Sequence, residues 1–234
     1  LMDICKSLPN DALIDIRVDE QKLIVKAGRS RFTLSTLPAN DFPSVEDGQG
    51  SPTFTLVQSK LRRLIERTSF AMAQQDVRYY LNGLLLDVRD NVLRCVATDG
   101  HRLALAEMDA PEGAAGLPGI IVPRKTVGEL RKLLDDDDAS IAVSVSETKV
   151  RFATPAITLT SKVIDGAFPD YMRVIPKGND KQADIDNAMF SKAVDRVATI
   201  SAEKSRSVKL AFELDRVTLT VRNMEAGQGV EEVE

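Results

Sequence analysis

SKVIDGAFPD, at residues 161–170, repeats an earlier segment of the chain, STLPANDFPS at residues 35–44, without a gap. The two segments begin 126 residues apart. Two pairs of alternating stretches precede them at nearly the same offset, LIDIRV (13–18) with SIAVSV (140–145) and KLIVKA (22–27) with KVRFAT (149–154). Self-similarity at a fixed period is the signature of a repeated structural unit. The sequence therefore predicts a repeating unit about 126 residues long.

A second part of the unit also repeats. SKLRRLIERTSFAMAQQDVR (59–78) has helical periodicity and resembles SKAVDRVATISAEKSR (191–206), and a pair of alternating strands follows each copy. The chain has 234 residues, so it holds fewer than two complete units. It begins with LMDICKSL, which resembles the end of a helix, and stops in the acidic GVEEVE after a strand pair. We therefore expect a fragment with the second half of one domain at 1–53, a complete domain at 54–171 and the first half of a third at 172–234.

Within the complete domain, the periodicity predicts two helices, each followed by strands with period-2 alternation. The expected helices cover 57–73 and 123–134, and the expected strands lie near 80–87, 92–98, 101–108, 140–146, 149–154 and 157–163. Pro123 suits the first turn of a helix, where its missing N–H costs nothing. Each half of a domain is thus one helix with several antiparallel strands. This pattern predicts the α+β class, with helices on one face of the sheets.

Composition restricts the class of protein. Hydrophobic residues make up 43% of the chain and tryptophan is absent, so the core must be aliphatic. Cys5 and Cys95 lack CxxC spacing and have apolar neighbours, which favours buried thiols in a reducing compartment over a disulfide. No apolar run approaches the roughly 18 residues of a membrane span, and no signal-peptide pattern opens the chain. We expect a soluble, cytoplasmic protein with no membrane partner.

The formal net charge of -4 argues mildly against a nucleic-acid partner, but the two signs are segregated along the chain. Basic residues recur on each predicted helix opposite its apolar stripe: Lys60, Arg63 and Arg67; Arg124, Lys125, Arg131 and Lys132; and Lys192, Arg196, Lys204 and Arg206. Acidic residues collect elsewhere, at Glu46, Asp47, Asp135 to Asp138, Glu231, Glu232 and Glu234. The basic faces are either simply solvated or form a positive track for a phosphate backbone. Since no helix-turn-helix, zinc-finger or RNP motif occurs, we expect any nucleic-acid binding to be non-specific.

The only histidine lies in ATDGHRLALAEM (97–108). A metal site on His101 lacks partners at ligand spacing, and the chain contains no GxSxG, GxGxxG or P-loop motif. Strand alternation predicts instead a hairpin with the turn Thr98-Asp99-Gly100-His101, in which Gly100 takes a positive φ. The residues favour this turn over catalysis, while hydrolysis at His101 with a distant nucleophile stays as an alternative. We expect no catalytic residue, no metal ion and no cofactor.

Five motifs are distributed over the chain: GRSRFTLSTLPANDFP (28–43), QDVRYYLNG (75–83), ATDGHRLA (97–104), VPRK (122–125) and DGAFPDYMRVIP (165–176). Together they resemble the bacterial DNA polymerase III β subunit family, the sliding clamps. In that family three similar domains form a subunit, and two subunits close head to tail into a ring with helices lining the hole. The resemblance implies the DNA clamp fold. It also implies a non-catalytic processivity factor for DNA replication, a homodimer that encircles duplex DNA.

The resemblance implies three sets of site residues. The pocket for the clamp-binding peptide of the polymerase III α subunit, the clamp loader and other partners matches Arg78, Leu81, Thr98, Gly100, His101, Arg102, Leu103, Pro169, Arg173 and Val174. DNA contacts match Gln75, Tyr79, Tyr80, Arg124 and Lys125, to which we add the face of Lys60, Arg63 and Arg67. The dimer interface matches Arg29, Arg31 and Phe32, which would meet Ile200 and nearby acidic residues of a second subunit.

The residue types at these pocket positions are compatible with peptide binding, because an apolar hollow rimmed by polar groups can hold a Leu or Phe anchor of a peptide. The apolar members are Leu81, Leu103, Pro169 and Val174. Two other functions are weighed against the clamp. One is the hydrolase that uses His101, and the other is a protein that binds DNA non-specifically without encircling it.

Overall fold

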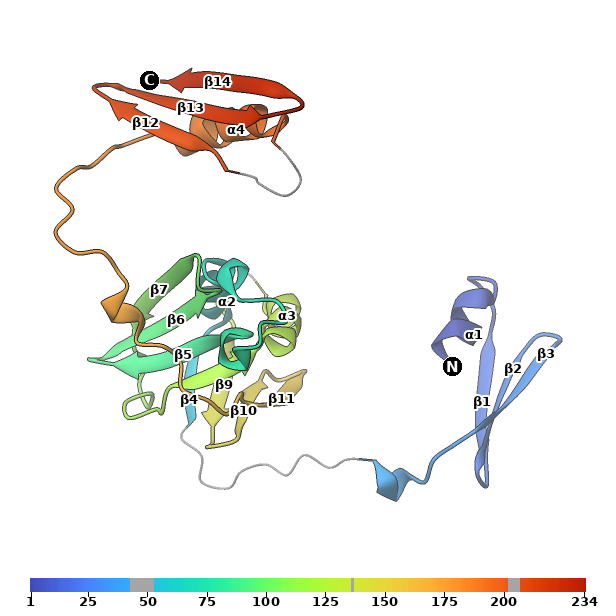
Figure 1. Cartoon of the computed structure of the whole chain (residues 1–234). Coiled ribbons are helices and arrows are strands. Elements are labelled where there is room, and N and C mark those ends of the chain that lie inside the picture. The colour runs from blue at the N-terminus through green and yellow to red at the C-terminus, as the bar shows by residue number, and fades with distance from the viewer. Residues whose placement is uncertain (43–52, 136, 202–206) are drawn as a thin grey trace. The chain divides into compact units, whose positions relative to one another are not determined.

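The computed structural model describes residues 1–42, 53–135, 137–201 and 207–234. These divide into two compact units, Leu1–Pro169 and Asp170–Glu234. In the first unit, an N-terminal part with one three-stranded sheet precedes a larger body with two sheets and two helices (Figure 1). None of the described helices is long and apolar enough to cross a membrane.

The N-terminal part holds helix α1 (Met2–Ser7) and an antiparallel sheet in the order β1-β2-β3. The strands cover Ile14–Asp19, Lys22–Ala27 and Ser30–Ser35. Two-residue turns join them, and Glu20 and Gly28 take the positive φ that such hairpin turns require. The register brings Ile16, Val25 and Phe32 into one row across the sheet. The strands predicted from the alternation at 13–18 and 22–27 are therefore confirmed.

The larger body contains two four-stranded antiparallel sheets. One has the order β7-β6-β5-β8, with strands Leu103–Asp109, Val92–Thr98, Gly83–Arg89 and Ile120–Pro123. The other has the order β11-β10-β9-β4, with strands Thr158–Lys162, Lys149–Ala153, Ser140–Val145 and Thr53–Val57. The predicted α+β arrangement of antiparallel strands is therefore confirmed for this body.

The two halves of this body exchange their first strands. β4 leads directly into helix α2 (Gln58–Glu66) but pairs with β9, while β8 leads into helix α3 (Arg124–Leu133) but pairs with β5. Each sheet is thus completed by a strand from the other half. Neither β4 nor β8 is among the strands that the sequence predicts.

Helix α2 is shorter than the predicted helix 57–73. Thr68 is fully buried, and its Oγ1 donates a hydrogen bond to the carbonyl oxygen of Leu64 at 2.8 Å. The backbone then turns through the short 3-10 segment η2 (Ser69–Ala71), where the N–H of Ala71 donates to the carbonyl of Thr68. Met72 continues the apolar period and is buried, although it lies outside the helix. Helical spacing therefore predicts the burial correctly and the helix end wrongly.

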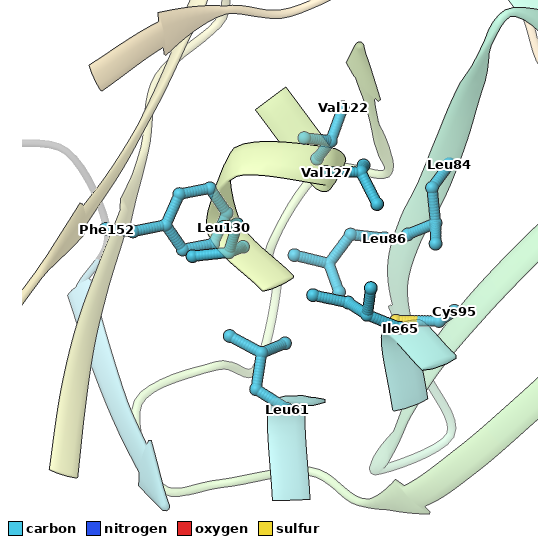
Figure 2. Close-up of a pocket in the computed structure, with 9 residues that line it drawn as sticks. All are labelled: Leu61, Ile65, Leu84, Leu86, Cys95, Val122, Val127, Leu130 and Phe152. Atoms are coloured by element: carbon cyan, nitrogen blue, oxygen red, sulfur yellow. The ribbon is translucent and has the colours of Figure 1, made fainter. Parts of the chain in front are cut away.

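An aliphatic core joins the two helices and the two sheets, as the composition predicts. Figure 2 shows the side chains around a small cavity within it, namely Leu61, Ile65, Leu84, Leu86, Cys95, Val122, Val127, Leu130 and Phe152. Burial of Cys95 raises the pKa of its thiol to about 12, so this thiol stays protonated and unreactive. Cys5 is only half-buried, so the prediction of two buried thiols is wrong for this residue.

The second unit comprises the 3-10 turn η4 (Tyr171–Arg173), helix α4 (Asn187–Ala198) and a three-stranded antiparallel sheet in the order β12-β13-β14. The strands cover Lys209–Glu213, Arg216–Asn223 and Gly227–Val233. Asp186 caps α4, because its carboxylate accepts a hydrogen bond from the N–H of Met189 at 2.7 Å. The acidic C-terminal stretch, predicted to follow a strand pair, is itself the third strand. Lys204 and Arg206 of the predicted basic face lie outside the described residues.

The repeat is visible in the strand order, since β1-β2-β3 reproduces β9-β10-β11. Equivalent positions differ in burial. Val143 of β9 is fully buried, whereas its repeat partner Ile16 of β1 is 50% exposed. The reason is that β9 pairs with β4 along one edge and lies over the core, while β1 pairs only with β2 among the described strands.

Candidate functional site

The predicted hairpin is present and carries a cluster of hydrogen-bonded polar side chains. β6 and β7 pair up to Thr98 and Leu103, so the loop is residues 99–102 and the second strand begins at Leu103 rather than at 101. Gly100 takes a φ of +87°, a conformation that favours glycine. The Oγ1 of Thr98 donates to the carbonyl of Arg102 at 2.7 Å and accepts from the N–H of Gly100 at 3.1 Å. The loop is therefore closed by hydrogen bonds at its base.

Asp99 holds the same loop from within. One carboxylate oxygen accepts from the backbone N–H groups of His101 at 2.9 Å and Arg102 at 3.0 Å, and the other accepts from the Nε of Arg102 at 3.1 Å. Desolvation of Asp99 raises its pKa, but these hydrogen bonds outweigh it and hold the pKa below the ordinary value. Asp99 thus directs its acceptors at the loop backbone and at Arg102, not at the imidazole of a catalytic dyad.

Arg78 joins this loop to the segment before β5. Its Nη2 donates to the carbonyl of Asp99 at 3.3 Å, and a Cβ built on Gly100 would lie 3.0 Å from the guanidinium nitrogens. Asp76 accepts three hydrogen bonds from Arg78, from the backbone N–H, from Nε and from Nη2. Asn82 fixes Asp76 in turn, since its side-chain amide bonds both the N–H and the carbonyl of that residue. The two segments therefore form one hydrogen-bonded cluster.

This cluster predicts a measurable titration. The side-chain and backbone hydrogen bonds from Arg78 lower the pKa of Asp76 to about 2. Because the folded pKa lies below the ordinary value of about 3.9, the pair stabilises the fold above about pH 4, and this contribution disappears as the pH falls towards 2. We expect carboxyl NMR to give a midpoint near 2 for Asp76, and Arg78→Met to raise this midpoint towards 4. The control Arg89→Met, which removes the ion-pair partner of Asp87 instead, should leave it unchanged. A midpoint near 4 in the unmodified chain would contradict the pairing.

The structure brings most of the predicted pocket residues together in the first unit. Arg78, Thr98, Gly100, His101 and Arg102 belong to the cluster, and Leu103 is half-buried where β7 begins. Leu81 is only 2% exposed, so its side chain offers almost no surface to a ligand. The other three predicted members lie apart in sequence: Pro169 at the end of the first unit, and Arg173 and Val174 in the second unit.

The predicted DNA-contact residues differ in their exposure and in the contacts that their side chains already make within the protein. Tyr79 is exposed, and its ring centroid lies 5.8 Å from that of Tyr80 in an edge-to-face arrangement, with Gly166 close to the Tyr79 ring and the Tyr80 Cβ. Gln75 takes a φ of +57° in the same segment. Arg124 is partly engaged, because its Nη1 donates to the carbonyls of Met72 and Ala73. Lys125 is exposed at the start of α3.

Acidic residues share a groove with the basic face of α2. Lys60, Arg63 and Arg67 line one side of an open groove whose other side carries Glu107 and Asp109 of β7. Other basic residues of the two helices are paired with acids: Arg62 and Arg131 with Glu66, and Lys132 with Glu129. The predicted positive track is therefore weaker along these helices than the count of lysines and arginines indicates.

The predicted dimer residues lie on one edge strand, in the turn before it and just after helix α4. Arg29 occupies the turn before β3, and Arg31 and Phe32 lie on β3, which is an edge strand of its sheet. Ile200 is half-buried behind α4, where its side chain packs 3.2 Å from the position of a Cβ on Gly229. Among the acidic residues, Glu231 is bound in two places by the guanidinium of Arg196, which lowers the pKa of Glu231.

One aromatic contact was not predicted from the sequence. The guanidinium carbon of Arg102 lies 5.6 Å from the centroid of the Phe70 ring, which is cation–π geometry. Phe70 lies just after α2, outside the apolar stripe of the helix, and no motif marks it. Its position beside the hairpin depends on tertiary structure, so periodicity alone could not reveal it. Within the described residues, no cluster of histidine, cysteine, aspartate and glutamate is placed to hold a metal ion.

Three protein-family models match successive parts of the chain. They describe the N-terminal domain of the DNA polymerase III beta subunit at residues 1–46, its central domain at 55–170 and its C-terminal domain at 172–234. The beta sliding clamp of Pseudomonas putida is 58% identical over the whole chain, and that of Escherichia coli K12 is 45% identical over 98% of it. The chain spans 64% and 62% of the lengths of these two relatives.

Solved structures give the same result. A crystal structure of the DNA polymerase sliding clamp from Pseudomonas aeruginosa with ligand matches with a TM-score of 0.89 and 55% identity, over 100% of this chain and 64% of that one. A DnaN sliding clamp from the same organism bound to griselimycin matches with a TM-score of 0.86 and 54% identity, over 100% of this chain and 63% of that one. With matching family models along nearly the whole sequence and this agreement in fold, the chain belongs to the DNA polymerase III beta subunit family.

Proposed function

We propose that this chain works as a sliding clamp, a non-catalytic processivity factor. With a second subunit it encircles duplex DNA and tethers the replicative polymerase through a docking site for a short peptide. The observation that carries the proposal is the closed hairpin loop 99–102, locked to Arg78, in a chain 58% identical to a curated beta sliding clamp. A rigid, partly apolar surface with polar groups around it suits peptide recognition.

The docking site rests on the cluster of Arg78, Thr98 and Arg102 with Leu103 beside it. Hydrogen bonds fix the loop before a ligand arrives, so little conformational entropy is lost on binding. Leu103 supplies the apolar contact, and the arginines supply donors for carbonyl or carboxylate groups of the peptide. By the family resemblance, Pro169, Arg173 and Val174 are proposed as further contacts of the peptide. The partners of the docking site are the polymerase III α subunit, the clamp loader and other proteins with the same motif.

DNA contact is proposed through Gln75, Tyr79, Tyr80, Arg124 and Lys125, together with Lys60, Arg63 and Arg67. Glu107 and Asp109 line the same groove as Lys60, Arg63 and Arg67, and Arg124 donates to two backbone carbonyls. Both features lower the positive potential, which agrees with a ring held by topology rather than by tight electrostatic binding. A protein that adheres to DNA without encircling it would need a stronger positive patch.

Further expectations belong to the same proposal. The domains divide at 1–53, 54–171 and 172–234, and the subunits meet through Arg29, Arg31 and Phe32 of one and Ile200 of the other. Replication takes place in the bacterial cytoplasm, so the cytoplasm is the proposed location. Asp99 bonds the loop backbone instead of orienting His101, so the geometry does not favour the alternative of a hydrolase.

Retention on circular DNA tests encirclement. After loading onto a nicked plasmid circle, the labelled chain should co-elute with the circle at moderate salt and be lost once a restriction enzyme linearises the DNA, because a ring slides off a free end. The control is the same plasmid incubated with enzyme that lacks a recognition site. Equal retention on circles and linear DNA, declining as salt rises, would identify a non-encircling DNA-binding protein instead.

A further inference from the structure

Phe70 is an aromatic residue on the surface of the first unit, beside the hairpin loop. Its side chain is 58% exposed, although phenylalanine is more often buried. It does not belong to the apolar stripe of α2, whose members are buried in the core. An exposed aromatic ring either has no function or forms part of a binding surface. The residues around it show which of these applies.

The backbone around Phe70 is firmly held. Buried Thr68 bonds the carbonyl of Leu64, and the next residues form η2, in which fully buried Ala71 bonds the carbonyl of Thr68. The backbone of Phe70 is thus fixed between two buried residues while its ring remains exposed. Because this backbone is fixed, the ring of Phe70 starts from a defined position on the surface.

Arg102 meets this ring and is held from two directions. On one side its Nε donates to Asp99 at 3.1 Å, and on the other its guanidinium carbon lies 5.6 Å from the Phe70 centroid. The Arg102 side chain is still 57% exposed, so the guanidinium remains open to a ligand. Two restraints on a long side chain limit its rotamers, and fewer rotamers are then lost when a ligand binds.

We propose that Phe70 is a positioning and contact residue of the peptide-docking surface. Its ring holds the guanidinium of Arg102 ready for a carbonyl or carboxylate of the partner, and its exposed area contacts an apolar side chain of the same peptide. The partner is thus a peptide with a large apolar residue next to a hydrogen-bond acceptor. This inference rests on the proposed function, since it extends the docking site of the clamp.

The test compares Phe70→Leu with Phe70→Tyr. Leucine keeps an apolar side chain but has no π face, whereas tyrosine keeps the ring. The probe is a fluorescent peptide that carries the clamp-binding segment of the polymerase α subunit, with affinity measured by anisotropy. Phe70→Leu should weaken binding about two- to fivefold, which is the range of an exposed cation–π contact, and Phe70→Tyr should restore affinity to within about twofold.

A second readout separates positioning from general structure. The Arg102 Nε–H resonance should be shifted by the ring current in the unmodified chain and in Phe70→Tyr, and should move to an ordinary position in Phe70→Leu. If Phe70→Leu binds as well as the unmodified chain while Leu103→Ala loses affinity, the docking site stands and the role of Phe70 is refuted. If the unmodified chain itself fails to bind the peptide, the proposed function fails first.

Discussion

Gly83→Ala is expected to lower the free energy of unfolding of the larger body by about 3 kcal/mol, at the upper end for an overpacked site. Gly83 begins β5 and pairs with Pro123 of β8. A Cβ there would lie 2.6 Å from the carbonyl oxygen of Val122 and 2.7 Å from a methyl of Ile121. Contact with a backbone oxygen cannot be relieved by rotating a side chain, so β8 must move away from β5.

The displaced strand leads into α3, so the damage extends to the candidate site. The N–H of Arg124 bonds the carbonyl of Asn82 at 3.0 Å, and its guanidinium holds the carbonyls of Met72 and Ala73. Thermal unfolding should show a fall of roughly 6 to 12 °C in Tm, since 1 kcal/mol corresponds to about 2 to 4 °C for chains of this size.

The matched control is Gly128→Ala. Gly128 lies inside α3, and a Cβ there would meet no atom of the described residues within 4 Å. Alanine is the better helix former by up to about 1 kcal/mol, so this variant should be equally or more stable than the unmodified chain. Equal Tm values for Gly83→Ala and Gly128→Ala would show that the close approach of β5 and β8 is not needed for stability.

The elements that the sequence predicts well are those whose pattern is local. β9 alternates over its whole length, and β6 lies between two recognisable turns, so the limits of both are correct within one residue. β8 is a run of four residues, buried throughout except for Pro123, and has no alternation to mark it as a strand. β4 alternates but continues into α2 without a breaker residue between them. In the larger body, the two strands that the sequence does not predict are the ones exchanged between its halves, which is a feature of tertiary structure.

The end of α2 shows a second limit. The apolar spacing continues from Leu61 to Met72, because both side chains enter the same core. Periodicity reports burial, however, and the helix ends where Thr68 hydrogen-bonds the preceding turn. The C-terminal strand β14 is also absent from the predicted strands, for a different reason. Its glutamates hide the alternation, although Glu231 is matched by Arg196 from α4.

In the candidate site, the sequence predicts the hairpin turn, but it does not predict which distant side chains contact that turn. An Asp-Gly pair between alternating strands indicates a hairpin with glycine at positive φ, as Gly100 shows. The contact of Arg78 with the loop joins residues 21 positions apart, and that of Phe70 with Arg102 joins residues from different layers. No spacing rule relates such pairs. They depend on η2 and the hairpin meeting in the folded chain.

Leu103→Ala is expected to weaken binding of the clamp-binding peptide by about thirtyfold, the effect of losing roughly 2 kcal/mol at a central apolar contact. Leu103 is half-buried at the start of β7, directly after the loop that Asp99 and Thr98 hold closed. Its backbone is thereby held next to Arg102, and truncation removes apolar area without removing a hydrogen bond of the polar cluster. Fluorescence anisotropy with the labelled peptide gives the affinity.

Leu105 provides a control on the same strand and the same face. It lies two residues further along β7 and is 37% exposed, outside the proposed pocket. Because both substitutions remove the same atoms from one sheet face, a general effect on the strand would appear equally in both. We expect Leu105→Ala to bind within about twofold of the unmodified chain, a change of no more than roughly 0.4 kcal/mol. If both variants lose affinity equally, the peptide binds along the open face of β7, and the hairpin loop does not determine where it docks.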